Sequence, residues 1–167
     1  SNAVISEWIE SPIRYQPDHP IVEKLRILAD DVLDPRALAH HYASIGRHAA
    51  DRWLDGDEAV PVKKYFYALR PALAIRCLRH DPAQRPPMNL QALIAASDVP
   101  ETLARDIAEL VEAKSRTNER SNGARMPAID ALIEAELARA SDVPGRSQPD
   151  EGHRARANQL FLDIVNS

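Results

Sequence analysis

The chain has 167 residues, of which 44% are hydrophobic and 28% are charged, a mixture typical of one globular domain with its own core. Its formal net charge of −4 argues against a generally basic nucleic-acid-binding surface. The single cysteine, Cys77, excludes an intramolecular disulfide and a cysteine-based zinc site. No apolar run reaches the ~20 residues that a membrane-spanning helix needs, so we expect a cytoplasmic protein with no membrane partner.

The fold class that the sequence predicts is all-α, a helical bundle with two long central helices. Abundant alanine, leucine, arginine and glutamate favour helix, and no β-branched or aromatic alternation is long enough for a strand. Asp34 and Asn89 suit N-caps, while Pro35 and Pro61 suit first helical positions. We expect helices over residues 4–10, 20–31, 35–55, 61–80, 89–95, 98–114 and 127–140, and a last helix that carries Leu160, Phe161 and Ile164.

The domain organisation follows from composition at the two ends. Residues 1–3 have the sequence of a tag remnant, and no start methionine follows them, so we expect Val4 to be an internal position of a longer protein. The helical bundle is expected over residues 4–141, a Pro/Gly/Ser-rich linker over 142–150 and a C-terminal helix over 151–167. Pro71 lies inside the second long helix and is expected to kink it, because proline removes the hydrogen bond to the carbonyl of Tyr67.

The start of the second long helix combines basic and aromatic side chains. Lys63 and Lys64 fall in its first turn, where cations oppose the helix macrodipole by roughly 0.3–1 kcal/mol each. An anion bound at the free backbone N–H groups would reverse the sign of that effect. Lysines, amides and the nearby Tyr65 and Tyr67 therefore indicate a nucleotide phosphate and its base; the alternative is a core helix with a basic, solvated edge.

Charge is also uneven along this part of the chain. Residues 63–85 contain six cations against one acid, Asp81, within an acidic protein. Such asymmetry fits a directed anion site better than nonspecific binding. The alternative is that Arg76 and Arg79 pair with acidic side chains of neighbouring helices.

The first long helix carries a second set of candidate side chains. His41, Ser44 and His48 share one face by their spacing, and Arg47 beside them suits a phosphate, because guanidinium pairs well with phosphate oxygens. We expect no metal here, since a zinc site needs a third ligand that the pattern does not specify. The alternative is that His41 and Tyr42 are interior polar groups with local hydrogen bonds.

Two short patterns suggest catalysis. Arg36 and His41 match the Arg-x4-His spacing of HEPN-type helical ribonucleases, in which the histidine transfers a proton and the arginine steadies phosphate charge. Asp55-Gly56-Asp57 matches an Asp-x-Asp magnesium motif, but it ends a helix, where glycine is explained by C-capping. We therefore assign no catalytic residue and keep the ribonuclease as the alternative enzyme.

Several short motifs follow one another in a defined order. They are Glu7-Trp8 with Ser11-Pro12, His41-Tyr42 with Ser44 and Arg47, the block from Lys63 to Ala74, Pro86-Pro87-Met88, Lys114, and Arg125-Met126-Pro127. In this order they resemble the helical C-terminal part of the predicted nucleotidyltransferases of the polymerase-β superfamily that are linked to RNA repair. The catalytic domain of that family carries a Gly-Ser motif and strand-borne acids that bind magnesium. This chain has no Gly-Ser pair and no predicted strand, so the resemblance implies the C-terminal region alone.

The resemblance implies a substrate-binding role. The complete enzyme would use Mg²⁺ and a nucleoside triphosphate to transfer a nucleotide to an acceptor such as RNA. Its partner would be the missing N-terminal catalytic domain, and this fragment alone would bind neither cofactor. Phosphate-binding residues would be Lys63, Lys64, Arg70 and Arg47. Base-stacking or cleft residues would be Tyr65, Tyr67, His41, Tyr42 and Ser44. The remaining alternative is a non-catalytic helical protein-interaction module.

Overall fold

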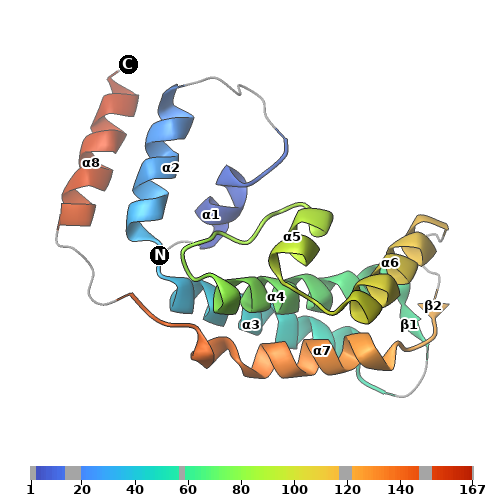
Figure 1. Cartoon of the computed structure of the whole chain (residues 1–167). Coiled ribbons are helices and arrows are strands. Elements are labelled where there is room, and N and C mark those ends of the chain that lie inside the picture. The colour runs from blue at the N-terminus through green and yellow to red at the C-terminus, as the bar shows by residue number, and fades with distance from the viewer. Residues whose placement is uncertain (1–2, 14–19, 57–58, 117–121, 147–151, 167) are drawn as a thin grey trace.

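The protein is described by a computed structural model that covers residues 3–13, 20–56, 59–116, 122–146 and 152–166. Within these residues it has eight α-helices, a 3₁₀ helix and one short strand pair, which confirms the predicted all-α bundle (Figure 1). The helices are α1 (Ala3–Ile9), α2 (Pro20–Val32), α3 (Pro35–Trp53), α4 (Val62–His80), α5 (Leu90–Ala96), α6 (Glu101–Arg116), α7 (Pro127–Ala138), η1 (Ala140–Asp142) and α8 (Gly152–Val165).

Helix α4 is the centre of the bundle formed by α3 to α7. Twelve of its 19 residues are buried, so it is apolar on nearly every side, as expected for a helix surrounded by others. It continues past Pro71, which is itself buried. Helix α3 approaches it closely at Gly46, where an added Cβ would lie 3.1 Å from the Cβ of Pro71 and 2.4 Å from Leu137 Cδ2. Glycine at this position thus lets α3 pack against both α4 and α7.

Helix α3 begins as predicted but ends earlier. The Asp34 carboxylate accepts hydrogen bonds from the N–H groups of Arg36 (3.0 Å) and Ala37 (3.2 Å), which confirms the N-cap. The helix stops at Trp53 rather than Asp55, with Gly56 beyond it at φ +100°. Asp57 of the Asp-x-Asp pattern lies outside the described residues. The carbonyls of Leu54 and Gly56 accept hydrogen bonds from Arg125, a residue too distant in sequence for local patterns to predict.

The start of α4 differs from the prediction in two ways. Pro61 is the N-cap rather than the first helical residue, and the helix begins at Val62. Val60–Pro61 (β1) pairs antiparallel with Asn122–Gly123 (β2), although we expected no strand. The pair is two residues long, too short to show in side-chain alternation, and a Cβ on Gly123 would lie only 2.8 Å from Val62 Cγ2.

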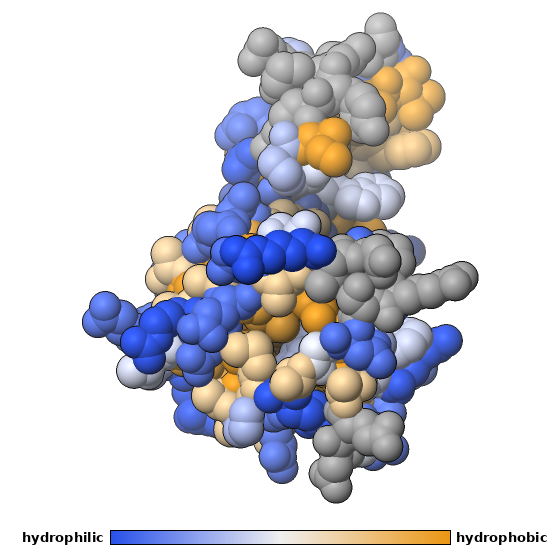
Figure 2. Space-filling view, turned by 90° about the vertical axis from the view of Figure 1, so that its right-hand side faces the viewer, coloured by the Kyte–Doolittle hydropathy of each residue, from blue (hydrophilic) through white to orange (hydrophobic). Residues whose placement is uncertain are grey.

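Helices α1, α2 and α8 form an arm that stands across one end of the bundle (Figure 1). Helices α2 and α8 lie side by side, with ion pairs between Lys24 and Asp163 (3.7 Å) and between Arg156 and Asp31 (3.5 Å). Leu160 of α8 is buried, whereas the adjacent Phe161 is 62% exposed. Figure 2 shows hydrophobic side chains at the surface of the upper part of the molecule, where the arm lies.

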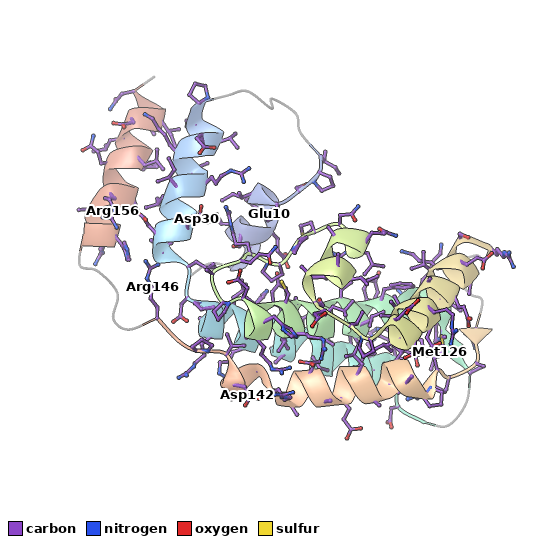
Figure 3. The ribbon with its side chains drawn as sticks, in the orientation of Figure 1. Glu10, Asp30, Met126, Asp142, Arg146 and Arg156 are labelled. Atoms are coloured by element: carbon purple, nitrogen blue, oxygen red, sulfur yellow. The ribbon has the colours of Figure 1, made fainter. Side chains whose placement is uncertain are left out.

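The connection from the bundle to the arm packs against both. Val143 is fully buried, and its carbonyl accepts a hydrogen bond from Arg36 Nε at 2.9 Å. Arg146 lies below the C-terminal end of α2 and donates to the carbonyls of Asp30, Asp31 and Leu33 (Figure 3). A cation at this end of a helix complements its macrodipole. Val143 and Arg146 therefore anchor the described part of the expected linker, and residues 147–150 lie outside the described residues.

Candidate functional site

A pocket of about 170 Å³ opens between the arm and the bundle. We call it the aromatic pocket, because Tyr42 of α3 and Phe66 and Tyr67 of α4 form one wall. The segment Pro86–Met88, between α4 and α5, also lines the pocket, and Glu7 of α1 reaches it from the arm. Aromatic, proline and methionine side chains make such a cavity suitable for a flat, partly apolar ligand.

Arg85 fixes the segment after α4 that lines the pocket with Pro86, Pro87 and Met88. Its side chain is 8% exposed and pairs with Glu10, the residue after α1, at 3.5 Å and with Asp30 of α2 at 3.0 Å. Figure 3 labels Glu10 and Asp30 on the arm, above the bundle. Glu10 lies three residues after Glu7, which is about one helical turn. Through its ion pair with Glu10, Arg85 thus connects the adjacent residues 86–88 to the helix that supplies Glu7.

Two charged groups of opposite sign line the aromatic pocket. The Tyr42 hydroxyl donates to the Glu7 carboxylate, and burial, followed by the charge and hydrogen bond of Glu7, raises the pKa of Tyr42. The positive charge of Arg70 acts in the opposite direction and lowers the pKa of Tyr42. Its Nη2 donates to the carbonyl of Met88 at 2.6 Å. The pocket thus has an acceptor group and a donor group among apolar walls.

Lysine amines lie on the aromatic rings of this site. Lys64 Nζ is 5.0 Å from the ring centroid of Tyr67 and 5.1 Å from that of Trp53. Lys114 Nζ, from α6, is 4.7 Å from the centroid of Phe66. At such distances the ammonium is attracted to the face of the ring. The rings of Tyr67 and Phe66 also line the pocket. The ammonium groups of Lys64 and Lys114 are therefore each separated from the pocket by one of these rings.

The two candidate tyrosines of α4 have different environments. Tyr67 is 53% exposed, so part of its ring remains accessible to a ligand. Tyr65 is fully buried, and its hydroxyl donates to Asp130 and accepts from the N–H of Met126 at 3.2 Å. Burial, followed by the hydrogen bond to Asp130, raises the pKa of Tyr65 to about 12. Tyr65 has no exposed face for a base in this structure, which corrects its assignment as a stacking residue.

The candidates on α3 are divided between two sides of the molecule. His41 is half-buried beside Tyr42, with ring centroids 5.9 Å apart, and Ser44 is exposed. Arg47 lines a separate cleft between α3 and α7, where its Nη2 donates to the carbonyl of Leu137 at 2.7 Å. Arg47 is therefore not brought together with Arg70 and Tyr67, contrary to the expectation of one shared cleft.

The remaining cations of residues 63–85 also divide into two groups. Arg76 and Arg79 pair with the buried Glu136 of α7 at 2.9 and 2.6 Å, as the structural alternative predicted. Lys63 and Lys64 occupy the first turn of α4, where, among the described residues, there is no acidic side chain and no side-chain cap. The basic edge near the pocket thus consists of Lys64, Arg70 and Lys114, with Lys63 adjacent to Lys64 in sequence.

The pair expected for a ribonuclease is not brought together. Arg36 donates to Val143 behind α3, whereas His41 lies beside Tyr42. Five residues of helix turn a side chain by about 140° relative to the first, which accounts for the separation. The described contacts give this alternative no support.

Sequence reasoning missed Glu7 and Lys114 as site residues. Both occur among the motifs that carried the family resemblance, but each is remote in sequence from α4. Their place beside Tyr42 and Phe66 follows from tertiary packing of α1 and α6.

Two features are absent from the described residues. No three His, Cys, Asp or Glu side chains there come together as a metal site. None of the helices in that part of the chain is both long enough and apolar enough to cross a membrane.

The fold and the site define an all-α domain with an aromatic pocket that lysines flank. The chain belongs to the RNA repair pathway DNA polymerase beta family (RlaP), whose family model matches residues 1–163. It is similar to the uncharacterized protein YcgL of Bacillus subtilis (strain 168), with 31% identity over 166 residues. That match covers 99% of this chain but 63% of YcgL, so the chain spans less than two thirds of that relative. No solved structure matches the chain significantly.

Proposed function

We propose that this chain is the nucleotide-binding region of a nucleotidyltransferase that acts on RNA. The observation that carries the proposal is the aromatic pocket with Lys64 and Lys114 on its rings. Aromatic faces favour bases and ammonium groups favour phosphates, and the two occur here within one site. Membership of the RNA repair family supports the same reading.

The base of the nucleotide would occupy the pocket. At about 170 Å³ the pocket is smaller than the roughly 300–1,000 Å³ of sites that enclose a whole drug-sized ligand. A base is the part of a nucleotide that is flat and small enough for it. The exposed Tyr67 would stack on the base. His41 and Ser44 do not line the pocket, so they are given no contact with the base.

The phosphates would lie along the start of α4. Lys63 and Lys64 supply positive charge there, and the backbone N–H groups of the first turn add the favourable end of the helix macrodipole. Arg70, which the resemblance placed with the phosphates, lies about two turns further along α4 and lines the pocket of the base. Arg47 would contribute only through long-range attraction, because it lies in the cleft against α7.

Nucleotide transfer itself would require the rest of the protein. The described residues provide no cluster for Mg²⁺, so the metal would be held by a catalytic domain that precedes this region. The role of this chain is then to bind and orient the nucleotide. Transfer to RNA remains part of the proposal, together with a cytoplasmic location.

The test is a binding titration of this chain with the four nucleoside triphosphates, followed by calorimetry or thermal shift. We expect affinities in the high micromolar to millimolar range, since part of the complete site is absent. Tyr67→Ala and Lys64→Ala should each weaken binding about tenfold, the lower end of what one stacked base contributes. Phe161→Ala and Lys24→Ala, on the exposed arm, are matched controls that should bind like the unaltered chain.

Two results would overturn the proposal. Absence of binding to any nucleotide at millimolar concentration would favour a protein-interaction module. Cleavage of RNA by the chain, lost in His41→Ala, would favour the ribonuclease alternative.

A further inference from the structure

The aromatic pocket contains one carboxylate whose hydrogen-bonding capacity is only partly used. Glu7 accepts a hydrogen bond from Tyr42. A carboxylate offers about four lone-pair positions on its two oxygens, so most of its acceptor capacity remains for a ligand. Glu7 lines the pocket and is neither fully buried nor fully exposed, so a ligand in the pocket can reach it.

Arg70 supplies the complementary donors. One of its five N–H groups is directed to the Met88 carbonyl, and this bond fixes the guanidinium against the wall of the pocket. Glu7 and Arg70 both influence the Tyr42 hydroxyl, one raising and one lowering its pKa. Both side chains line the same pocket of about 170 Å³, so one base bound there can reach both.

We infer that the pocket selects guanine over the other bases, an inference that rests on the proposed nucleotide-binding function. Guanine presents two adjacent donors, N1–H and the N2 amino group, which match the two oxygens of Glu7. On the neighbouring edge its O6 and N7 are acceptors, the pair that arginine binds most often. One base thus satisfies both Glu7 and Arg70 in the plane of its ring.

The other bases place a lone pair against the carboxylate. Adenine and cytosine each have an unprotonated ring nitrogen beside their amino group, and uracil has carbonyl oxygens on both sides of its N3–H. Each would leave a buried acceptor facing an acceptor, which a hydrogen-bonding site penalises strongly. The aromatic walls attract every base, so the preference depends on Glu7 and Arg70 alone.

The experiment compares GMP, AMP, CMP and UMP binding to the full 167-residue chain by calorimetry. GMP should bind about tenfold more tightly than the others, the scale of one good bidentate pair. Glu7→Gln should remove this advantage and strengthen AMP binding, because the amide N–H₂ can donate to the ring nitrogen of adenine that the carboxylate opposes. Glu109→Gln, an exposed glutamate on α6, is the matched control and should keep it.

Ligand analogues test the same contacts without altering the protein. IMP, which lacks the N2 amino group, should bind several-fold more weakly than GMP because it loses a contact with Glu7. 7-deaza-GMP, which lacks N7, should also bind more weakly than GMP because it loses a contact with Arg70. Equal binding of all bases would overturn guanine selection and leave nucleotide binding intact. A GMP preference unchanged in a folded Glu7→Gln chain, or unaffected by both analogues, would also overturn it. Failure of every nucleotide to bind would instead contradict the proposed function.

Discussion

The bundle and the arm differ in how much apolar surface they bury, although both are helical. Leu69 and Leu73 of α4 are fully buried, as are many side chains around them. In the described part of the arm the buried apolar residues are Ile9, Ala29 and Leu160, while Trp8 is 72% exposed. Burial of apolar surface is the main stabilising term in folding, so the bundle should provide most of the stability.

The difference matters because the aromatic pocket draws on both regions. Tyr42 and Tyr67 come from the bundle, and Glu7 comes from the arm. The arm is fastened largely by charged side chains, Arg85 and Arg146, rather than by a core. Changes in the bundle should therefore affect global stability, whereas changes at the joint should affect the shape of the pocket.

The largest effect is expected from the buried charge cluster of the bundle. Glu136 is 2% exposed and pairs with both Arg76 and Arg79. Glu136→Gln would leave two guanidinium groups without a counter-charge, a loss of about 3–5 kcal/mol in the free energy of unfolding. Urea denaturation measures it, with the exposed Glu134→Gln on the same helix as control. A loss below about 1 kcal/mol would show that solvent compensates these charges.

The next prediction compares one leucine from each region. Leu69→Ala removes a fully buried side chain of α4 and should lower the free energy of unfolding by about 3–5 kcal/mol. Leu160→Ala on α8 should cost about 1.5 kcal/mol, because its surroundings are more open and can relax. Equal losses, measured by urea denaturation of both variants, would mean that the arm is as well packed as the bundle.

Sequence patterns were sufficient for the helices because their signals are local. Asp34 and Asn89 cap the helices that were expected to start after them, and proline and apolar spacing located the others. The β1–β2 pair and the early end of α3 were missed, since they depend on Gly123 and Arg125, which are distant in sequence. Local propensity carries no information about such contacts.

The candidate site was predictable only in part for the same reason. Tyr67 and Arg70 lie three residues apart and therefore share one face of α4. Both line the pocket, as this periodicity of the helix allows. The same periodicity directs Tyr65 into the core and Arg47 toward α7, but the sequence did not show which face of each helix is inward. Glu7 joins the site through the arm, and only the tertiary structure reveals this.

The joint between the regions offers a smaller effect. Arg85→Ala removes the two ion pairs to Glu10 and Asp30 and should lower the free energy of unfolding by about 1–2 kcal/mol. If the arm positions Glu7, the variant should also lose part of any GMP preference without contacting the ligand. Lys24→Ala, which breaks an exposed pair within the arm, should cost less than about 0.5 kcal/mol and leave binding unchanged. Identical behaviour of the two variants would show that Arg85 does not fasten the arm.

The effect of pH is an alkaline loss of stability that should come from the bundle. Burial, followed by the charge of Asp81, raises the pKa of Cys77 from 9.0 to about 11, and the pKa of Tyr65 rises from 10.0 to about 12. A group whose folded pKa is raised contributes stability that is complete below its unfolded pKa and is lost as pH rises toward its folded pKa. Between pH 9 and 10 the Cys77 thiol should therefore cost about 1 kcal/mol, with Tyr65 adding to the loss between pH 10 and 12. Urea denaturation across this range should show a flatter profile for Cys77→Ala below pH 10 and for Tyr65→Phe above it. An alkaline loss that neither variant changes would mean that these two groups of α4 are not its source.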